Sequence, residues 1–236
     1  MRLFAIGDLH LSFGTDKPMD VFGPKWENHA RRLKENWERT VSPDDVVILA
    51  GDFSWGMSMG EALEDFRFVE ALPGRKLLVK GNHDYWWGTA SKIKSFFAQN
   101  GIESFDILHN NAFVCGDAAV CATRGWVLEN GGMPDEHDKK IFAREMMRLE
   151  MSLKRAKEAG AGDITAVMHY PPLLRNFTDS PFTVLMRSYG VRRCLFGHLH
   201  GAAQSNAVTG LVDGIDYRLI AADYIDFCPR LIALLG

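Results

Sequence analysis

The residues Gly81-Asn82-His83-Asp84 form a polar motif between the apolar run Lys76-Leu77-Leu78-Val79 and the aromatic cluster Tyr85-Trp86-Trp87. The apolar run predicts a buried strand, and Gly81-Asn82 predicts a turn, because glycine and asparagine tolerate positive φ. Open α/β sheets bind ligands where turns leave the carboxyl ends of strands. Asn82 offers a carbonyl oxygen to a metal, and His83 offers a nitrogen that titrates near neutral pH. Taken alone, the motif fits a ligand site and an ordinary polar turn equally well, so the rest of the chain has to decide.

Two earlier apolar runs end in the same way. Residues 2–6 lead into Gly7-Asp8-Leu9-His10, and the β-branched run 46–50 leads into Gly51-Asp52. Asp8 and His10 are two residues apart, so on an extended chain they point to the same side. A carboxylate and an imidazole aimed together at the end of a strand suit a metal ion. The alternative is an Asp–His hydrogen bond within a loop.

Two later runs also end in histidine. Residues 163–168 lead into His169, and the Pro171-Pro172 pair that follows predicts a stiff, extended exit. Residues 191–196 lead into Gly197-His198-Leu199-His200-Gly201. By itself His169 could be an ordinary loop histidine. His198 and His200, in contrast, would repel each other if both were charged. A shared metal site removes that conflict.

The composition fits one soluble globular domain over residues 1–236. The hydrophobic fraction is 47%, the charged fraction is 24% and the net charge is -3, so no basic face for nucleic acid is indicated. The four cysteines show no Cys-x-x-Cys spacing, which favours reduced thiols over disulfides or a thiolate zinc site. The apolar start of the chain is too short for a signal peptide or a membrane span. We therefore expect a cytoplasmic protein; the sequence does not indicate an oligomeric state.

Helical and strand patterns alternate along the chain. The periodicity of apolar residues predicts helices over 25–39, 60–72, 90–100, 137–159 and 182–189. Their alternation with the apolar runs predicts a largely parallel sheet whose loops gather at one edge. Short runs at 105–108, 112–115 and 118–123 suit antiparallel strands of a second sheet. Closing strands are expected near 210–219 and 230–235, and loops over 11–24, 125–135 and 173–180.

All the polar residues at these strand ends can bind metal ions through oxygen or imidazole nitrogen. They are Asp8, His10, Asp52, Asn82, His83, His169, His198 and His200. Such donors without thiolates suit manganese, iron or zinc. The set is larger than one ion needs, so we expect two divalent or trivalent metal ions.

The ordered blocks Asp-x-His, Gly-Asp, Gly-Asn-His-Asp, His and Gly-His-x-His resemble the calcineurin-like metallophosphoesterase superfamily. The resemblance extends from Asp8 to His200. It implies an α/β (α+β type) fold, a four-layer αββα sandwich of two mixed β-sheets flanked by helices. It also implies roles by position. One metal would be held by Asp8, His10 and His200, and the other by Asn82, His169 and His198. Asp52 would bridge the two ions.

The resemblance further implies a dinuclear phosphohydrolase that cleaves phosphate mono- or diesters. In such a centre, two ions share a water and convert it into a hydroxide that attacks phosphorus. His83 would be the catalytic acid that donates a proton to the leaving alkoxide. Asp84 would either assist catalysis by orienting His83 or lie in a solvated turn.

This sequence differs from the protein phosphatase branch of that superfamily. That branch has arginine beside the Gly-Asp and Gly-Asn-His blocks, whereas here Phe53-Ser54-Trp55-Gly56 follows the first and Lys80 precedes the second. A lysine cannot reproduce the bidentate grip of a guanidinium group. We therefore expect a small phosphate ester or a nucleotide as the substrate. Candidate pocket residues, each of which could equally be packing or surface, are Trp55, Trp86, Trp87, Arg124, Trp126 and Arg175.

Two other functions remain open. One is a nuclease or nucleotide phosphodiesterase of the same fold, which a diester substrate would distinguish from a monoesterase. The other is a non-catalytic scaffold that uses the fold to bind partners. A scaffold would be expected to have lost ligands, and every ligand block is intact here.

Overall fold

The computed structural model describes residues 1–126, 135–175 and 179–235. The loops predicted over 125–135 and 173–180 therefore lie partly outside the described residues. Within the described part, no helix is both long enough and apolar enough to cross a membrane. The described strands form a five-stranded sheet in the order β11-β1-β2-β3-β4 and a six-stranded sheet in the order β5-β6-β7-β8-β10-β9.

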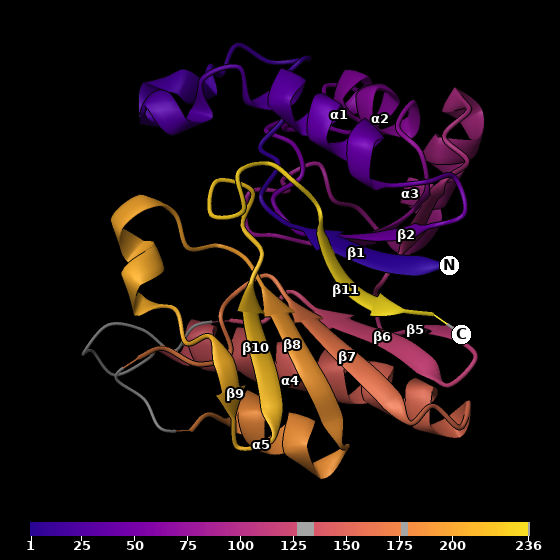
Figure 1. Cartoon of the computed structure of the whole chain (residues 1–236), viewed down its shortest axis with the longest axis vertical. Helices are drawn as coiled ribbons and strands as arrows, with labels where there is room; N and C mark the ends of the chain where they lie inside the picture. The colour runs from indigo at the N-terminus through magenta and orange to yellow at the C-terminus, as the bar shows by residue number, and fades with distance from the viewer. Residues whose placement is uncertain (127–134, 176–178, 236) are drawn as a thin grey trace.

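Two sheets stack face to face, with helices outside both (Figure 1). The first sheet contains β1 (Arg2–Ile6), β2 (Val46–Ala50), β3 (Arg75–Val79), β4 (Phe105–Ile107) and β11 (Arg230–Leu234). The second contains β5 (Ala112–Cys115), β6 (Ala118–Thr123), β7 (Asp163–Met168), β8 (Val191–Phe196), β9 (Gly210–Val212) and β10 (Ile215–Leu219). This is the αββα sandwich that the family resemblance implies.

The helices form the two outer layers. The first sheet is covered by α1 (His29–Thr40), α2 (Leu63–Glu70) and α3 (Ala90–Asn100), and the second by α4 (Glu136–Glu158) and α5 (Pro181–Ser188) (Figure 1). Three 3-10 helices, η1 (Met19–Phe22), η2 (Pro24–Trp26) and η3 (Gly201–Asn206), lie in the connections. The helix predicted over 25–39 begins only at His29, because the chain before it turns as η1 and η2.

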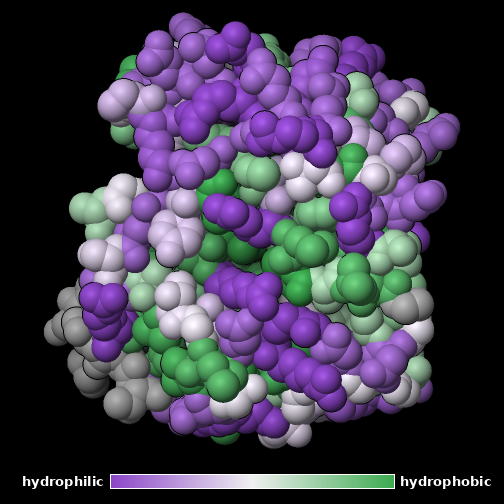
Figure 2. Space-filling view, in the orientation of Figure 1, coloured by the Kyte–Doolittle hydropathy of each residue, from purple (hydrophilic) through white to green (hydrophobic). Residues whose placement is uncertain are grey.

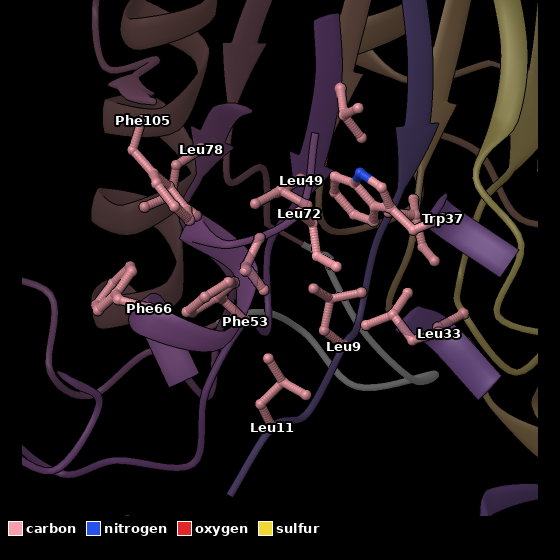
Figure 3. Packing of buried hydrophobic residues seen from close by; sticks show 14 of the residues in the cluster. Leu9, Leu11, Leu33, Trp37, Leu49, Phe53, Phe66, Leu72, Leu78 and Phe105 are labelled. Atoms are coloured by element: carbon pink, nitrogen blue, oxygen red, sulfur yellow. The ribbon is translucent and has the colours of Figure 1, made fainter. Parts of the chain in front are cut away.

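Three apolar clusters explain this layering. Alternate residues of a strand point to opposite faces, so β1 sends Leu3 and Ala5 between the sheets and Phe4 and Ile6 toward the helices. The helix-side cluster fills the space between the first sheet and α1–α3 (Figure 3). A corresponding cluster joins the second sheet to α4 and α5. Strands buried on both faces require uninterrupted apolar runs, as the sequence shows.

One predicted pairing is wrong. The run 105–108 was expected to join antiparallel strands of the second sheet, but β4 pairs in parallel with β3, with Lys76 opposite Phe105. The unit β3-α3-β4 is a crossover connection, and Phe105 packs in the cluster beneath the helices of the first sheet. The antiparallel pairing of β5 with β6 is as expected, whereas β6 then pairs in parallel with β7.

The exposed face in Figure 2 is largely hydrophilic, with apolar side chains over the edge strand β11. Leu231 and Leu234 are the exposed large apolar residues of that strand. The loops that follow the carboxyl ends of β1, β2, β3, β7 and β8 converge. The backbone N–H of Gly7, after β1, donates to the carbonyl oxygen of Ile220, after β10 of the other sheet, at 2.8 Å. Within the second sheet, the N–H of Gly197 donates to the carbonyl oxygen of His169 at 3.1 Å.

Candidate metal centre

The structure brings the seven expected ligands together where the two sheets meet. In the first group, Nε2 of His10 lies 3.4 Å from Nε2 of His200. The same His200 nitrogen lies 3.5 Å from Oδ1 of Asp8. One donor atom from each of the three residues lies within 4.8 Å of the others, close enough to hold one ion together.

The second group is centred on the side-chain oxygen of Asn82. Its Oδ1 lies 2.7 Å from Nε2 of His169 and 2.9 Å from Nδ1 of His198. The three residues come from different strands, since Asn82 follows β3, His169 follows β7 and His198 follows β8. The amide oxygen and two imidazole nitrogens therefore face one point from both sheets.

Asp52 lies between the two groups. Its Oδ2 is 3.8 Å from Nε2 of His10 and 3.4 Å from Nε2 of His169. Asp52 also belongs to a second set of donor atoms within 4.8 Å, formed with Asp8 and His169. One carboxylate oxygen thus reaches ligands of both groups, as a bridging residue must.

The backbone adopts unusual conformations at these ligands. The φ angles are 57° at Asp8, 46° at His10, 49° at Asp52 and 70° at His198. Non-glycine residues pay an energetic cost in this left-handed region, and such residues cluster at functional sites. Backbone hydrogen bonds hold the turn, with the N–H of Asp8 donating to Gly51 at 2.9 Å and that of His10 donating to Asp52 at 3.0 Å.

Two glycines allow the carboxylates to approach the chain closely. A Cβ atom on Gly81 would lie 2.1 Å from Oδ1 of Asp52, and one on Gly197 would lie 2.2 Å from Oδ2 of Asp8. Neither position can accept a side chain without moving a carboxylate. The glycines that precede Asn82 and His198 are therefore part of the construction of the centre.

Asp84 is buried, and its carboxylate accepts hydrogen bonds from backbone N–H groups. Its Oδ2 accepts from Asp52 at 3.0 Å and Gly81 at 2.7 Å. Its Oδ1 accepts from Phe53 at 2.9 Å and from the indole of Trp86 at 3.0 Å. The solvated-turn alternative is therefore wrong. The contacts fit a residue that positions the loop of Asp52, and the catalytic role expected of Asp84 stays a prediction.

His83 lies at the edge of the cluster and is half-buried. Its ring centroid is 5.8 Å from that of His10 and 4.6 Å from that of Trp55. Its backbone N–H donates to Oδ1 of Asp52 at 2.8 Å. Its ring Nδ1 is buried without a hydrogen-bond partner among the described residues. A polar nitrogen left in that state is free to meet a ligand.

The electrostatics of the cluster favour bound cations. Burial, together with the charge of Asp8, raises the pKa of Asp52 to about 8. Burial lowers the pKa of His10 and His169, and lowers that of His198 to about 4. The raised pKa of Asp52 shows that a second buried negative charge beside Asp8 is unfavourable, and bound cations would offset it. The imidazoles of His10, His169 and His198, whose pKa values are lowered, keep free lone pairs for such cations. The donor chemistry therefore fits metal ions.

Two ligands are oriented by groups behind them. Nδ1 of His200 lies 2.9 Å from Oδ1 of Asp223, and Nδ1 of His169 lies 3.1 Å from the carbonyl oxygen of Ala50. Such outer partners fix which ring nitrogen faces a metal. Burial would lower the pKa of His200, but the hydrogen bonds to Asp223 and Asp8 outweigh it and raise that pKa to about 10. Asp223 was not predicted, although it follows the apolar run 219–222.

Of the candidate pocket residues, Trp55 lies against the cluster, stacked on His10 with centroids 4.9 Å apart. The others lie elsewhere. Trp86 is bound to Asp84, Trp87 packs on Trp86, Arg124 pairs with Glu145, Trp126 donates to Asp138, and Arg175 is exposed.

A sequence profile of the calcineurin-like phosphoesterases matches residues 1–202. The chain belongs to the calcineurin-like phosphoesterase family. This confirms the resemblance that the ligand blocks indicate. The family consists of metal-dependent phosphoesterases, and the buried Asp/His clusters of this chain agree with that chemistry.

Curated relatives of this calcineurin-like phosphoesterase match only part of it. The Gene 66 protein of Mycobacterium phage L5 is 34% identical over 79 residues, which are 33% of this chain and 37% of the phage protein. The Gene 66 protein of Mycobacterium phage D29 is 36% identical over 78 residues, again 37% of its length. The matches thus span little more than a third of these relatives.

Solved structures share the fold over nearly the whole chain. The phosphopantetheinyl hydrolase of Mycobacterium tuberculosis has a TM-score of 0.56 at 14% identity, covering 98% of this chain and 95% of that one. A protein of unknown function from Aquifex aeolicus has a TM-score of 0.50 at 16% identity, with the same coverage. At these identities the similarity concerns the fold alone.

Proposed function

We propose that the protein is a dinuclear metal-dependent phosphohydrolase acting on phosphate mono- or diesters. The observation that supports this most strongly is the position of Asp52. Its Oδ2 lies within 3.8 Å of an imidazole nitrogen from each ligand group. Asp8, His10 and His200 would hold one ion, and Asn82, His169 and His198 the other. The donor set suits manganese, iron or zinc.

Two such ions, when bound, would lower the pKa of a water molecule and offset the negative charge of the phosphate. The chain supplies the positions. Turns held by backbone hydrogen bonds present the carboxylates, and Asp223 and Ala50 orient the imidazoles. Preorganised groups of this kind reduce the rearrangement needed during reaction.

His83 is the proposed proton donor to the leaving alkoxide. Burial lowers its pKa, and the neighbouring charges of His169 and Lys17 add to that effect. A bound phosphate dianion beside the ring opposes this shift and favours the protonated imidazole. His83 therefore acquires its acidic proton when substrate is present, which is when a general acid is needed.

The scaffold alternative is less well supported. A protein that only binds partners has no need to hold seven donor groups in one buried cluster with four of them in left-handed backbone conformations. We therefore prefer the enzyme. An assay with both ester types decides whether the protein cleaves monoesters or diesters. The same assay tests the nucleotide phosphodiesterase alternative. The four unpaired cysteines suit the cytoplasmic location that we propose.

The test is metal reconstitution. Protein stripped with a chelator is given manganese, iron or zinc singly, and hydrolysis of para-nitrophenyl phosphate and of its bis-ester is measured beside metal content. We expect about two ions per chain and metal-dependent hydrolysis. Asp52→Asn removes the shared charge, so both ions should bind more weakly, whereas Asp44→Asn changes an exposed carboxylate and serves as the control. Unchanged metal content in Asp52→Asn would refute the bridging role.

A further inference from the structure

A cavity of about 320 Å³ opens beside the candidate metal centre. It is lined by the imidazoles of His10, His83 and His200 and by an aromatic wall that includes Phe22 and Trp26. Its volume is at the lower end of the range of about 300–1,000 Å³ for small-molecule sites. A phosphate held by the metal centre would extend its organic part into this space.

The aromatic wall comes from an extended connection. Residues 7–28 link β1 to α1, whereas such links usually have about 2–6 residues. The η1 and η2 helices within this link supply Met19, Phe22 and Trp26 to the cavity. Phe22 is 58% exposed, although exposing a large apolar side chain to water is unfavourable. A loop of this length with an exposed phenyl group at a cavity suggests a binding surface.

The rings that line the cavity are held in fixed positions. Trp55 stacks on His10 with an interplanar angle of 23°, and its indole N–H donates to the sulfur of Met19 at 3.0 Å. Trp26 is 5% exposed and packs edge-on against His10 at 5.7 Å and His200 at 5.6 Å. The aromatic wall is therefore continuous with the metal ligands.

The polar groups of the cavity limit what it can bind. Among the described residues that line it, Lys25 is the one lysine, and none is arginine. The guanidinium forks that grip a second phosphate or a phosphopeptide are thus missing from this wall. Lys17 lies close by, with Nζ 3.4 Å from the centroid of the Trp55 ring, and forms a cation–π contact with that ring.

We infer that this cavity binds a flat aromatic ring carried by the alcohol component of the substrate, as in a nucleoside or aryl phosphate. The inference rests on the proposed function, because it takes the phosphate to lie at the metal centre. Contacts with the exposed ring of Phe22 and with Trp26 provide the binding energy, because His10 and Lys17 already cover the ring of Trp55. The distance from the ring to the phosphate then selects the ester that reaches the nucleophile.

The test compares adenosine 5′-monophosphate with ribose 5-phosphate. Both release a primary alkoxide at C5 of a ribose unit, so a difference in kcat/KM reports the contribution of the base. We expect the nucleotide to be favoured at least about tenfold, the effect of stacking one base. Phe22→Ala should reduce that preference about five- to tenfold. Val21→Ala, an exposed neighbour outside the cavity lining, should leave it unchanged.

A second measurement does not depend on turnover. The nucleotide should quench tryptophan fluorescence at concentrations where ribose 5-phosphate does not, and Phe22→Ala should weaken that quenching. Equal kcat/KM for the two esters, with no effect of Phe22→Ala, would overturn the inference and leave the hydrolase standing. Quenching by the nucleotide without hydrolysis of any ester would support the ring site and remove the proposed reaction. Neither quenching nor hydrolysis would overturn both.

Discussion

Oδ1 of Asp223 lies 2.9 Å from Nδ1 of His200, and this contact leaves Nε2 of His200 facing Asp8 and His10. Asp223 is 1% exposed, and its other oxygen accepts from the side chain of Gln204 at 2.8 Å. A buried carboxylate behind an imidazole fixes both the tautomer and the orientation of the ring. The first ligand group thus depends on a residue beyond the family motif blocks.

Asp223→Ala should therefore weaken metal binding about 10- to 100-fold, because His200 loses its fixed orientation. Asp223→Asn keeps an oxygen acceptor and should lose less. Titration of the metal-free variants with manganese by calorimetry measures the effect. Gln204→Ala is the matched control, since it removes only a neighbour of Asp223. A manganese affinity of Asp223→Ala equal to that of the parent would show that His200 needs no support.

His83→Ala should retain both metals, because the His83 ring is not one of the seven proposed metal ligands. Removing a general acid lowers the rate about 10²- to 10⁴-fold where the leaving group needs a proton. We therefore expect a large loss of kcat for alkyl phosphates and a smaller loss for para-nitrophenyl phosphate, whose leaving group is already stable as an anion. Equal losses for the two ester types would count against the acid role.

Asp84→Ala should destabilise the fold and disturb the Asp52 loop. The backbone N–H groups of Asp52, Phe53 and Gly81 would lose their buried acceptor. Each unsatisfied buried group costs about 1–3 kcal/mol, so we expect a decrease of at least about 2 kcal/mol in the free energy of unfolding. Urea denaturation gives this value. Asp44→Ala changes an exposed residue and should have almost no effect. An Asp84→Ala variant as stable as its parent would show that the hydrogen bonds to Asp84 do not stabilise the fold.

Lys76, which lies away from the candidate metal centre, should make the stability of the fold depend on pH. It is fully buried in β3, with Nζ donating to the hydroxyl of Ser104 at 3.0 Å, and burial lowers its pKa to about 8. Between pH 8 and 10.5 the unfolded chain binds more protons than the folded protein, so this residue makes stability rise with pH. At and below neutral pH the amine is charged in both states and burying it is unfavourable.

Lys76→Met should therefore gain stability relative to the parent at pH 7, and that relative gain should shrink by about 3 kcal/mol by pH 10.5. Urea denaturation at the two pH values measures the difference. Lys34→Met, at an exposed position on α1, provides the comparison. A stability difference for Lys76→Met that does not change with pH would contradict the shifted pKa.

Much of the fold could be predicted because β1, β2, β3, β7 and β8 are buried on both faces. Such strands need continuous apolar runs, and their ends are easily seen where glycine and a polar residue follow. The partner of β4 was not predictable in the same way. Its three residues suit either sheet by themselves, and the packing of Phe105 beneath the helices decides the pairing.

The sequence by itself determined the chemistry of the candidate centre, because oxygen and imidazole donors at the ends of five strands limit what can bind there. Only the tertiary structure decided which donors meet. Asp52 reaches both ligand groups, Asp84 holds the Asp52 loop, and Asp223 supports His200 through contacts between segments far apart in the chain. Residue spacing reports the direction of a side chain along one strand, but the stacking of two sheets brings distant strand ends within hydrogen-bond distance.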